Sequence, residues 1–297
     1  MSTHAKPRAR FSDYLELTKP RLSLLSVLTA LVGYFAARPA NDPMRIILVV
    51  LGASLAAAGV AALNQWIESD TDAQMKRTAD RPIPSGKVAT GSAFVLGALM
   101  CIVALFLLFA RVNHLSALFT LLTIVSYLGW YTPAKQWSRW STEIGAIAGA
   151  FPPLIGWAAA EGRISALGWI LFGVLFFWQI PHFMAIAWTY RRDYSVVNFP
   201  MLPVRDEAGG KVAAWALLNT LALVFVSLLP VTMGFATNAY AAAAVGCGVW
   251  FIWRAIGFLK AEGRDVASRQ LFFTSIAYLP LLLGMLVVDR VFIFQPK

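Results

Sequence analysis

Eight long stretches without a charged side chain constrain the fold of this sequence more than any other feature. A transmembrane helix needs about 20 consecutive apolar residues to cross a bilayer. The charge-free stretches cover residues 22–37, 46–67, 88–110, 112–134, 144–160, 164–190, 212–253 and 270–288. The stretch 212–253 is long enough for two crossings, and Pro230, Gly234 and Asn238 predict a turn near its middle. The sequence therefore predicts an all-α polytopic membrane protein with nine transmembrane helices.

The composition excludes several other classes of protein. Of the 297 residues, 59% are hydrophobic and 13% are charged, whereas soluble domains have about 45–50% apolar and about 25% charged residues. A soluble globular enzyme, a disordered chain and a disulfide-stapled secreted module are therefore excluded. We interpret the net charge of +10 as loop topology and attraction to anionic membrane lipid, with no nucleic-acid partner.

Charged residues gather on one side of the predicted bundle. Nineteen of the 25 basic residues fall in the N-terminal tail and the even-numbered loops, which the positive-inside rule assigns to the cytoplasm. We expect residues 1–20 to form a cytoplasmic tail, residues 1–297 to form one transmembrane domain, and the C-terminus to lie outside. Twelve of the 15 acidic residues fall on the same side as the tail. A membrane face rich in both acidic and basic residues favours an active site on that side. The alternative is that the loops on this side are simply longer and more solvated, which would give the same numbers of charged residues.

The second predicted span runs into an acidic segment. If the helix continues, Asn64, Glu68 and Asp72 follow one another at i, i+4 and i+8 and stack along one face. Asp70 then points elsewhere, or toward the same cavity if the helix unwinds. Carboxylates this close repel one another, and a divalent cation removes that cost. Magnesium is bound by a few carboxylates together with retained water and substrate phosphate oxygens. The segment therefore predicts a Mg²⁺ site made by Glu68, Asp72 and Asn64.

Basic side chains follow the acidic segment. Arg77 and Arg81 are again four residues apart, and arginine binds phosphate through a planar fork of donors. Lys135 ends the fourth span on the same side, where it can neutralise a phosphate or extend to the lipid headgroups. Acidic residues that can bind a metal ion, followed by basic residues that can bind phosphate, are typical of a diphosphate-binding site. The alternative is a solvated loop of mixed charge.

A second polar cluster ends the sixth span. Pro181 predicts a kink, and His182 beside it would bond a freed carbonyl, contact a substrate or ligate a haem iron. Asp193 lies eleven residues later, on nearly the same face of a continuous helix. Asp193 would hold a second cation or pair with Arg191 and Arg192, and these alternatives stay open.

Four segments together resemble a known enzyme family. The run from Asn64 to Pro82 resembles the first aspartate-rich motif of the UbiA-type intramembrane prenyltransferases. Three further segments narrow the resemblance to the branch that farnesylates haem, and the likeness covers residues 14–290. These segments are ELTKPR at 16–21, GAFPPLIGW at 149–157, and WQIPHF at 178–183 with Asp193-Tyr194 and PMLP at 200–203.

The resemblance implies nine helices around a central cavity, in the inner membrane of a bacterium. It also implies transfer of a farnesyl group from farnesyl diphosphate to a vinyl group of haem b, with Mg²⁺ as cofactor, and contact with haem A synthase or with terminal oxidase assembly. The implied catalytic residues are Asn64, Glu68, Asp70, Asp72 and Asp193. The implied diphosphate contacts are Arg77, Arg81, Lys135 and Arg192, and the implied haem contacts are His182, Tyr194 and Trp178.

The sequence departs from the family pattern at one position. The first acidic residue of the family motif is usually aspartate, and here it is Glu68, whose longer side chain moves a metal ligand by about one C–C bond. Because magnesium demands tight octahedral geometry, we expect Glu68 to act through water. The second cluster also lacks the paired aspartates of the quinone-type relatives, which agrees with the haem branch.

Three competing interpretations remain. A related prenyltransferase for a quinone precursor or another aromatic acceptor would share the first cluster and differ in its pocket. A transporter would carry acids at mid-membrane and inverted repeats, and this sequence shows neither. A non-catalytic assembly factor for a terminal oxidase would not need the array of carboxylates.

Overall fold

The computed structural model describes residues 9–40 and 42–294, all of whose regular elements are helical. Lys6, Arg8 and Lys297, which entered the charge count, lie outside the described residues. The elements in chain order are α1 (Phe11–Leu17), α2 (Pro20–Ala36), α3 (Pro43–Ile67), α4 (Ser69–Asp72), α5 (Thr90–Arg111), α6 (His114–Val125), η1 (Ser126–Tyr131), α7 (Thr132–Trp137), α8 (Ser141–Ala150), α9 (Pro152–Glu161), α10 (Ala166–Thr189), α11 (Arg191–Val196), α12 (Leu202–Arg205), α13 (Gly210–Thr232), α14 (Asn238–Leu259), α15 (Arg264–Val288) and η2 (Asp289–Ile293).

The nine predicted spans are all helical, which confirms the predicted fold class. In the part of the chain that the structure describes, eight helical segments are long and apolar enough to cross a bilayer. The remaining span is α2, whose 17 residues extend about 26 Å and are at the short end of the range for a crossing. The predicted turn in the stretch 212–253 is present, and Gly234 adopts a φ of 73° between α13 and α14.

Local signals explain where several helices begin and end. Asp42 accepts a hydrogen bond from the backbone nitrogen of Arg45 at 3.0 Å and caps α3. Asn113 caps α6 in the same way, through the backbone nitrogen of Ser116 at 2.8 Å. These side chains satisfy donors that a helix N-terminus leaves unpaired. Gly162 ends α9 with a φ of 69°, a conformation that glycine adopts without a steric penalty.

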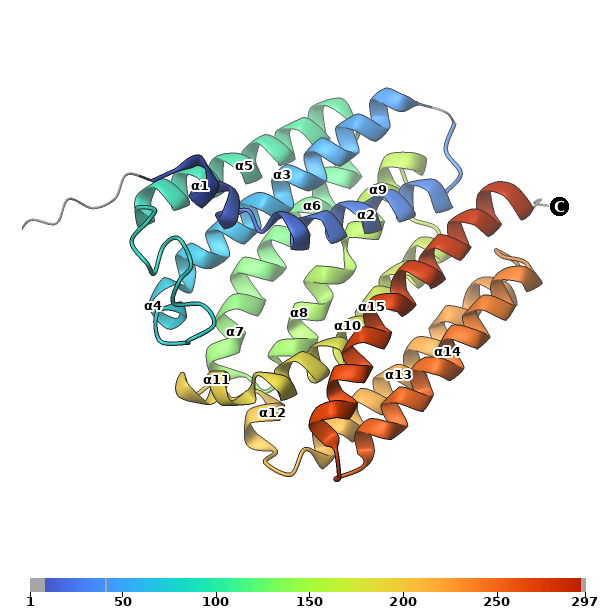
Figure 1. Ribbon diagram of the computed structural model, residues 1–297. Helices are drawn as coiled ribbons and strands as arrows, with labels where there is room; N and C mark the ends of the chain where they lie inside the picture. The colour runs from blue at the N-terminus through green and yellow to red at the C-terminus, as the bar shows by residue number, and fades with distance from the viewer. Residues whose placement is uncertain (1–8, 41, 295–297) are drawn as a thin grey trace, which may run out of the picture.

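The helices form an antiparallel bundle in which α10 is the most central element. Helix α10 packs against α8, α13 and α15, and its buried side chains belong to the largest hydrophobic cluster. The loops at residues 68–89 and 190–209, which carry α4, α11 and α12, lie at one end of the bundle (Figure 1). We call this end the loop end and the opposite one the far end.

Side chains of η2 connect three parts of the bundle at the far end. Arg290 donates from Nε to the carbonyl of Ala36 at 3.0 Å and from Nη1 to that of Phe235 at 3.1 Å. The buried carboxylate of Asp289 accepts hydrogen bonds from the backbone nitrogen and the hydroxyl of Thr237. The ends of α2, α13 and α15 are therefore held together here, whereas α2 and α15 draw apart toward the loop end (Figure 1).

Helices α2 and α9 cross in backbone contact. A Cβ atom on Gly156 would lie 1.7 Å from the carbonyl oxygen of Ala30, and one on Gly33 would lie 1.9 Å from that of Pro153. Neither neighbour is a flexible side chain, so the contact requires glycine at both positions. The crossing leaves no space between the two helices at this depth.

Candidate active site

The three predicted metal ligands lie where α3 passes into α4. Helix α3 ends at Ile67 and Glu68 leaves helical geometry. The backbone hydrogen bonds nevertheless continue, from Glu68 to the carbonyl of Asn64 at 3.0 Å and from Asp72 to that of Glu68 at 2.8 Å. The exposed fractions of Asn64, Glu68 and Asp72 are 2%, 6% and 1%. The expected stacking is therefore present, and all three side chains are buried in the protein.

Each buried carboxylate has a basic partner from another segment. The Lys135 ammonium lies 2.7 Å from Oε1 of Glu68. The Arg81 guanidinium lies 2.5 Å from Oδ2 of Asp72. Lys135 therefore points into the bundle and does not extend to the lipid headgroups. The two pairs connect α4, the loop after it and α7 into one cluster.

Lys19 is a third basic residue of the cluster. The sequence places it in the basic tail and in the ELTKPR segment, without a predicted role in the site. Its Nζ donates to Oδ1 of Asn64 at 3.2 Å, and Nδ2 of Asn64 donates to the Thr132 hydroxyl at 3.2 Å. Lys19 has a φ of 45°, which bends the chain between α1 and α2. The signal that could have identified Lys19 is its place in the ELTKPR segment, immediately before the proline that starts α2.

The electrostatics of the cluster favour an additional anion. Burial, together with the charges of Arg81 and Lys135, lowers the pKa of Lys19 from 10.5 to about 7. Burial alone would raise the pKa of Glu68, but the Lys135 ammonium beside it holds that pKa below its usual value. Lys19, Arg81 and Lys135 give three basic groups against two carboxylates. An anion bound next to Lys19 would favour its charged form.

A π-helical segment places two tyrosines beside the cluster. In η1 the Tyr127 and Tyr131 rings meet edge to face, with centroids 5.0 Å apart. The Lys135 ammonium lies 4.5 Å from the centroid of the Tyr131 ring. Short π-helical segments often occur at functional sites because they re-aim side chains within a helix. Here the segment gives the cluster an aromatic wall.

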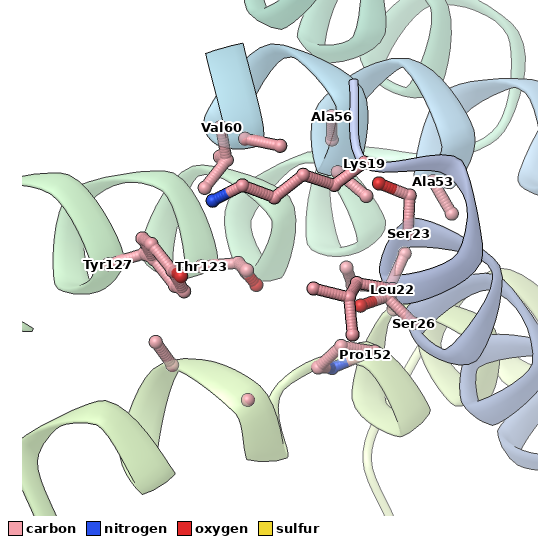
Figure 2. A pocket seen from close by; sticks show the side chains of 15 residues that line it. Lys19, Leu22, Ser23, Ser26, Ala53, Ala56, Val60, Thr123, Tyr127 and Pro152 are labelled. Carbon is pink, nitrogen blue, oxygen red and sulfur yellow. The ribbon is translucent and has the colours of Figure 1, made fainter. Parts of the chain in front are cut away.

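A mainly apolar cavity of about 160 Å³ opens next to the cluster. Figure 2 shows the Lys19 side chain reaching across it, with Val60 and Ala56 on one side and Pro152 on the other. Five helices and η1 contribute to its wall. The lining residues are Lys19, Leu22, Ser23, Ser26, Ala53, Ala56, Ala57, Val60, Ala61, Thr123, Tyr127, Ala148, Gly149, Pro152 and Ile155.

Asp70 and Arg77 lie apart from the buried pairs. The Asp70 side chain is exposed, as expected from the helical spacing. Arg77 donates to the Tyr194 hydroxyl at 3.4 Å, and its guanidinium lies 5.2 Å from the Tyr190 ring and 5.7 Å from the Tyr194 ring. The segment after α4 is not an α-helix, so the four-residue spacing does not bring Arg77 and Arg81 together. Arg77 instead joins this loop to the segment after α10.

The predicted haem contacts lie where α10 faces α15. Nδ1 of His182 lies 2.7 Å from the Ser275 hydroxyl. The Trp178 indole nitrogen donates to the Ser275 carbonyl at 2.7 Å. The His182 ring stacks between Trp178, at a centroid distance of 4.7 Å, and Phe272, at 5.1 Å. His182 thus bonds a hydroxyl of a neighbouring helix, and its ring belongs to an aromatic stack.

The continuous helix expected between His182 and Asp193 is wrong. Helix α10 ends at Thr189, and a new short helix, α11, begins at Arg191. Asp193 is half-buried and Arg192 is exposed on α11. Arg191 pairs with Asp265 of α15 at 3.2 Å. The break re-aims α11, so helical spacing does not relate Asp193 to His182.

The donor set of the cluster fits magnesium only when a phosphate completes its coordination. Among the residues that the structure describes, no three His, Cys, Asp or Glu side chains form a ready-made metal cage. Glu68, Asp72 and the amide oxygen of Asn64 supply two carboxylates and one neutral oxygen. Magnesium in phosphate-transferring sites is bound by one or two carboxylates, substrate phosphates and water. These three residues would hold such an ion.

Fold and site together define a polytopic helical membrane protein with a buried acid–base cluster above an apolar cavity. The profile of the UbiA prenyltransferase family matches residues 26–277. A protoheme IX farnesyltransferase of Opitutus terrae is 71% identical over 99% of both chains, and one of Solibacter usitatus is 40% identical over 94% of this chain and 98% of its own. The chain belongs to the UbiA prenyltransferase family and groups there with the protoheme IX farnesyltransferases. It is therefore a transferase and an integral, multi-pass membrane protein.

Solved structures show the same fold. A digeranylgeranylglyceryl phosphate synthase aligns with a TM-score of 0.80 at 18% identity, covering 94% of this chain and 98% of its own. A UbiA homologue of Archaeoglobus fulgidus, solved with GPP and Mg²⁺ bound, aligns with a TM-score of 0.68 at 13% identity, covering 92% and 99%.

Proposed function

We propose that this protein transfers the farnesyl group of farnesyl diphosphate to a vinyl group of haem b and releases diphosphate, in a reaction that depends on Mg²⁺. The observation that carries the proposal is the buried cluster of Glu68, Asp72 and three basic side chains directly beside an apolar cavity. The relatives named protoheme IX farnesyltransferase support the choice of substrates. We further propose that the loop end faces the cytoplasm of a bacterial cell, because most basic residues lie at that end.

The cluster binds and activates the diphosphate. Lys19, Arg81 and Lys135 donate to its oxygens, and Glu68 and Asp72 would hold the cation that accompanies it. A bound Mg²⁺ supplies positive charge to the diphosphate oxygens as the bond to carbon breaks. Because the cluster is buried, its charges act at low dielectric and stabilise the leaving group strongly. Water bridging Glu68 to the cation would accommodate its longer side chain.

The cavity receives the allylic chain. Its apolar wall excludes water, so the allylic cation that forms when the C–O bond breaks is protected from hydrolysis. The face of the Tyr127 ring can stabilise this cation at the border between cluster and cavity. The electron pair of the haem vinyl group forms the new C–C bond, and water adds to the resulting cation and loses a proton. The product is a hydroxyethylfarnesyl haem.

The haem is proposed to lie against α10. Trp178, His182 and Phe272 stack on one another there, and binding of haem would separate these rings so that a flat π face meets the porphyrin. Tyr194, Arg192 and Asp193 lie on α11 at the loop end, where a polar haem edge would face water. A hand-off of product to haem A synthase or to terminal oxidase assembly would use the same end.

The direct test is a reaction of the purified protein with haem b, farnesyl diphosphate and magnesium, analysed by mass spectrometry. We expect haem whose mass has increased by one farnesyl group and one hydroxyl group. Parallel reactions replace haem with 4-hydroxybenzoate as the acceptor, and Asp72→Asn serves as the inactive reference. Prenylated hydroxybenzoate without farnesylated haem would instead assign the chain to quinone-type prenyl transfer. Release of diphosphate with neither product would contradict both acceptors.

A further inference from the structure

We propose that Arg191 and Arg269 bind the carboxylates of the two haem propionates, so that the vinyl edge of the porphyrin points away from the loop end. The inference deepens the proposed function and rests on it only in taking haem as the acceptor. It concerns how the acceptor is oriented, which the aromatic stack between α10 and α15 does not decide. Aromatic rings bind the face of a porphyrin, and a face contact does not distinguish the propionate edge from the vinyl edge.

The Arg191 guanidinium is held in position where the end of α10 meets α15. Its Nη1 donates to the Trp188 carbonyl at 2.7 Å and lies 3.2 Å from Oδ1 of Asp265. The guanidinium also lies 4.1 Å from the centroid of the Trp188 ring, and the indole of Trp188 donates to the same carboxylate oxygen at 2.8 Å. A guanidinium presents a planar fork of donors that matches a carboxylate. Arg191 is therefore already oriented to bind one.

Arg269 gives this end of α15 a second guanidinium. It follows Asp265 by four residues and precedes Phe272 by three, so these side chains lie along one face of the helix. Arg269 is exposed, and the Asp265 side chain is 67% exposed. Two guanidinium groups therefore lie near one carboxylate, which leaves an excess of positive charge for a further anion. A haem brings two carboxylates, and Asp265 marks the position that one of them would take.

The distance from the aromatic stack to these arginines matches the length of a propionate. On α10, Trp188 follows His182 by six residues, which is about 9 Å along the helix axis. On α15, Asp265 precedes Phe272 by seven residues, which is about 10 Å. With bonds of about 1.5 Å, the carboxylate of a propionate lies roughly 8 Å from the centre of the porphyrin. A haem bound against His182 therefore brings its carboxylates to the level of Arg191.

The same orientation brings the vinyl groups toward the apolar cavity. Vinyl and propionate groups occupy opposite edges of the porphyrin, so the vinyl groups would lie near the level of Gln179, three residues before His182. The Gln179 amide donates to the Ala146 carbonyl of α8 at 3.1 Å and packs against Gly149, which lines the cavity. An inverted haem would instead place two carboxylates in this apolar region, at a high cost in desolvation.

Asp265 competes with a propionate for Arg191. An ion pair as exposed as this one contributes little to stability, so a propionate can replace the Asp265 carboxylate at low cost. The Trp188 carbonyl and ring would keep the guanidinium oriented during the exchange. Removal of the Asp265 charge should therefore strengthen the binding of haem.

The test compares haem b with its dimethyl ester, which lacks the two carboxylate charges and keeps the ring, the iron and both vinyl groups. Spectroscopic titration of the purified full chain, without farnesyl diphosphate, gives the affinities. We expect the wild type to bind haem b about tenfold more tightly than the ester. Arg191→Gln and Arg269→Gln should each weaken the binding of haem b severalfold and leave the binding of the ester nearly unchanged.

Asp265→Asn is the most specific variant, because it removes the competing charge and keeps an acceptor for the Trp188 indole. It should strengthen the binding of haem b and leave that of the ester unchanged. An ion pair with a purely structural role would give the opposite result, which is weaker binding of both compounds. Arg254→Gln is the matched control. Arg254 donates to Gln270, on a different face of α15, and its loss should leave both affinities unchanged.

Equal affinity of the wild type for haem b and its dimethyl ester would overturn the inference and assign these arginines to lipid headgroups. So would parallel losses for both compounds in Arg191→Gln and Arg269→Gln, together with no gain in Asp265→Asn. Preference for haem b over the ester without farnesylation of haem would refute the proposed reaction and retain the inference. Farnesylation of both compounds, bound with equal affinity, would retain the proposed reaction and overturn the inference.

Discussion

The Arg81 guanidinium lies 2.5 Å from the Asp72 carboxylate, which precedes it by nine residues in the chain. The same arrangement recurs between Lys135 and Glu68 at 2.7 Å, across two different helical segments. Each acid that would bind a cation is thus already paired with a base that would bind phosphate. A magnesium diphosphate presents both signs at once, so it can replace both partners without leaving a buried charge uncompensated.

The substitution Asp72→Asn tests the negative charge of this side chain without changing its size. Asp72→Asn keeps the size of the side chain and removes the negative charge, so we expect prenyl transfer to fall by about a hundredfold or more. Steady-state turnover with saturating magnesium measures the effect, and thermal unfolding in detergent reports whether the fold is retained. Asp80→Asn, at an exposed position of the same loop, is the matched control. Near-normal turnover of the Asp72 variant would refute its role at the diphosphate.

Lys135→Met should impair both stability and binding. The variant leaves the buried Glu68 carboxylate without its ion-pair partner, which lowers the free energy of unfolding by about 3 kcal/mol or more. It also removes a donor to the diphosphate, so the KM for farnesyl diphosphate should rise. The double variant Glu68→Gln, Lys135→Met should regain stability but not activity, since no charge is then left unpaired. Recovery of turnover in the double variant would show that the pair is structural, and Lys87→Met is the control for loss of an exposed lysine.

A haem contact at His182 predicts an effect on one substrate only. His182→Ala removes the ring from the stack with Trp178 and Phe272, and we expect haem b affinity to fall while farnesyl diphosphate affinity stays within about twofold. Spectroscopic titration with haem b and competition with labelled farnesyl diphosphate give the two values. Ser275→Ala removes the contact of the hydroxyl with Nδ1 of His182 and its hydrogen bond to the Phe272 carbonyl, leaves the His182 ring in place, and should have the smaller effect. Equal losses for both substrates would indicate that His182 supports only the packing of α10.

The close crossing of α2 and α9 predicts that glycine-to-alanine substitutions differ in their effect on stability, depending on whether the glycine lies at the crossing. Gly156→Ala forces a methyl group onto the Ala30 carbonyl, and overpacking of this kind costs about 1–3 kcal/mol. Gly246→Ala in α14 meets no neighbouring atom and should stabilise its helix by about 0.5–1 kcal/mol. Thermal unfolding of the two variants in the same detergent makes the comparison. A Gly156 variant as stable as the wild type would show that the helices can separate at this depth.

The sequence predicts the spans of this protein well because crossing a bilayer requires long apolar segments. The charge-free stretches locate the helices, and Pro230 with Gly234 locates the turn that divides the longest stretch. The burial of Asn64, Glu68 and Asp72 is predictable for a related reason. Helical periodicity continues through the hydrogen bonds of the backbone even where α3 ends.

Features that depend on packing between distant segments could not be predicted in this way. Arg77 follows helical spacing in the sequence, but its segment is a loop, and the arginine contacts Tyr194 of another loop. In the sequence Lys19 belongs to a run of basic residues, and only the structure shows that its left-handed backbone conformation directs the side chain to Asn64. The close crossing of α2 and α9 depends on Gly33 and Gly156 together with the carbonyls that they face, and no pattern within either helix contains that information.

The hydrogen bonds of Arg290 and Asp289 fasten the ends of α2, α13 and α15 to one another. At the loop end Arg264 of α15 donates to the carbonyl of Ala208, just before α13. Helices α13 and α15 are therefore joined at both ends, and it is α2 that draws away from α15 there (Figure 1). If haem is the acceptor, as proposed, we expect the bundle to widen for it at the loop end, where α2 and α15 draw apart (Figure 1). We expect the hydrogen bonds of Arg290 and Asp289 to keep the far end closed during turnover, which would prevent ions from leaking across the membrane.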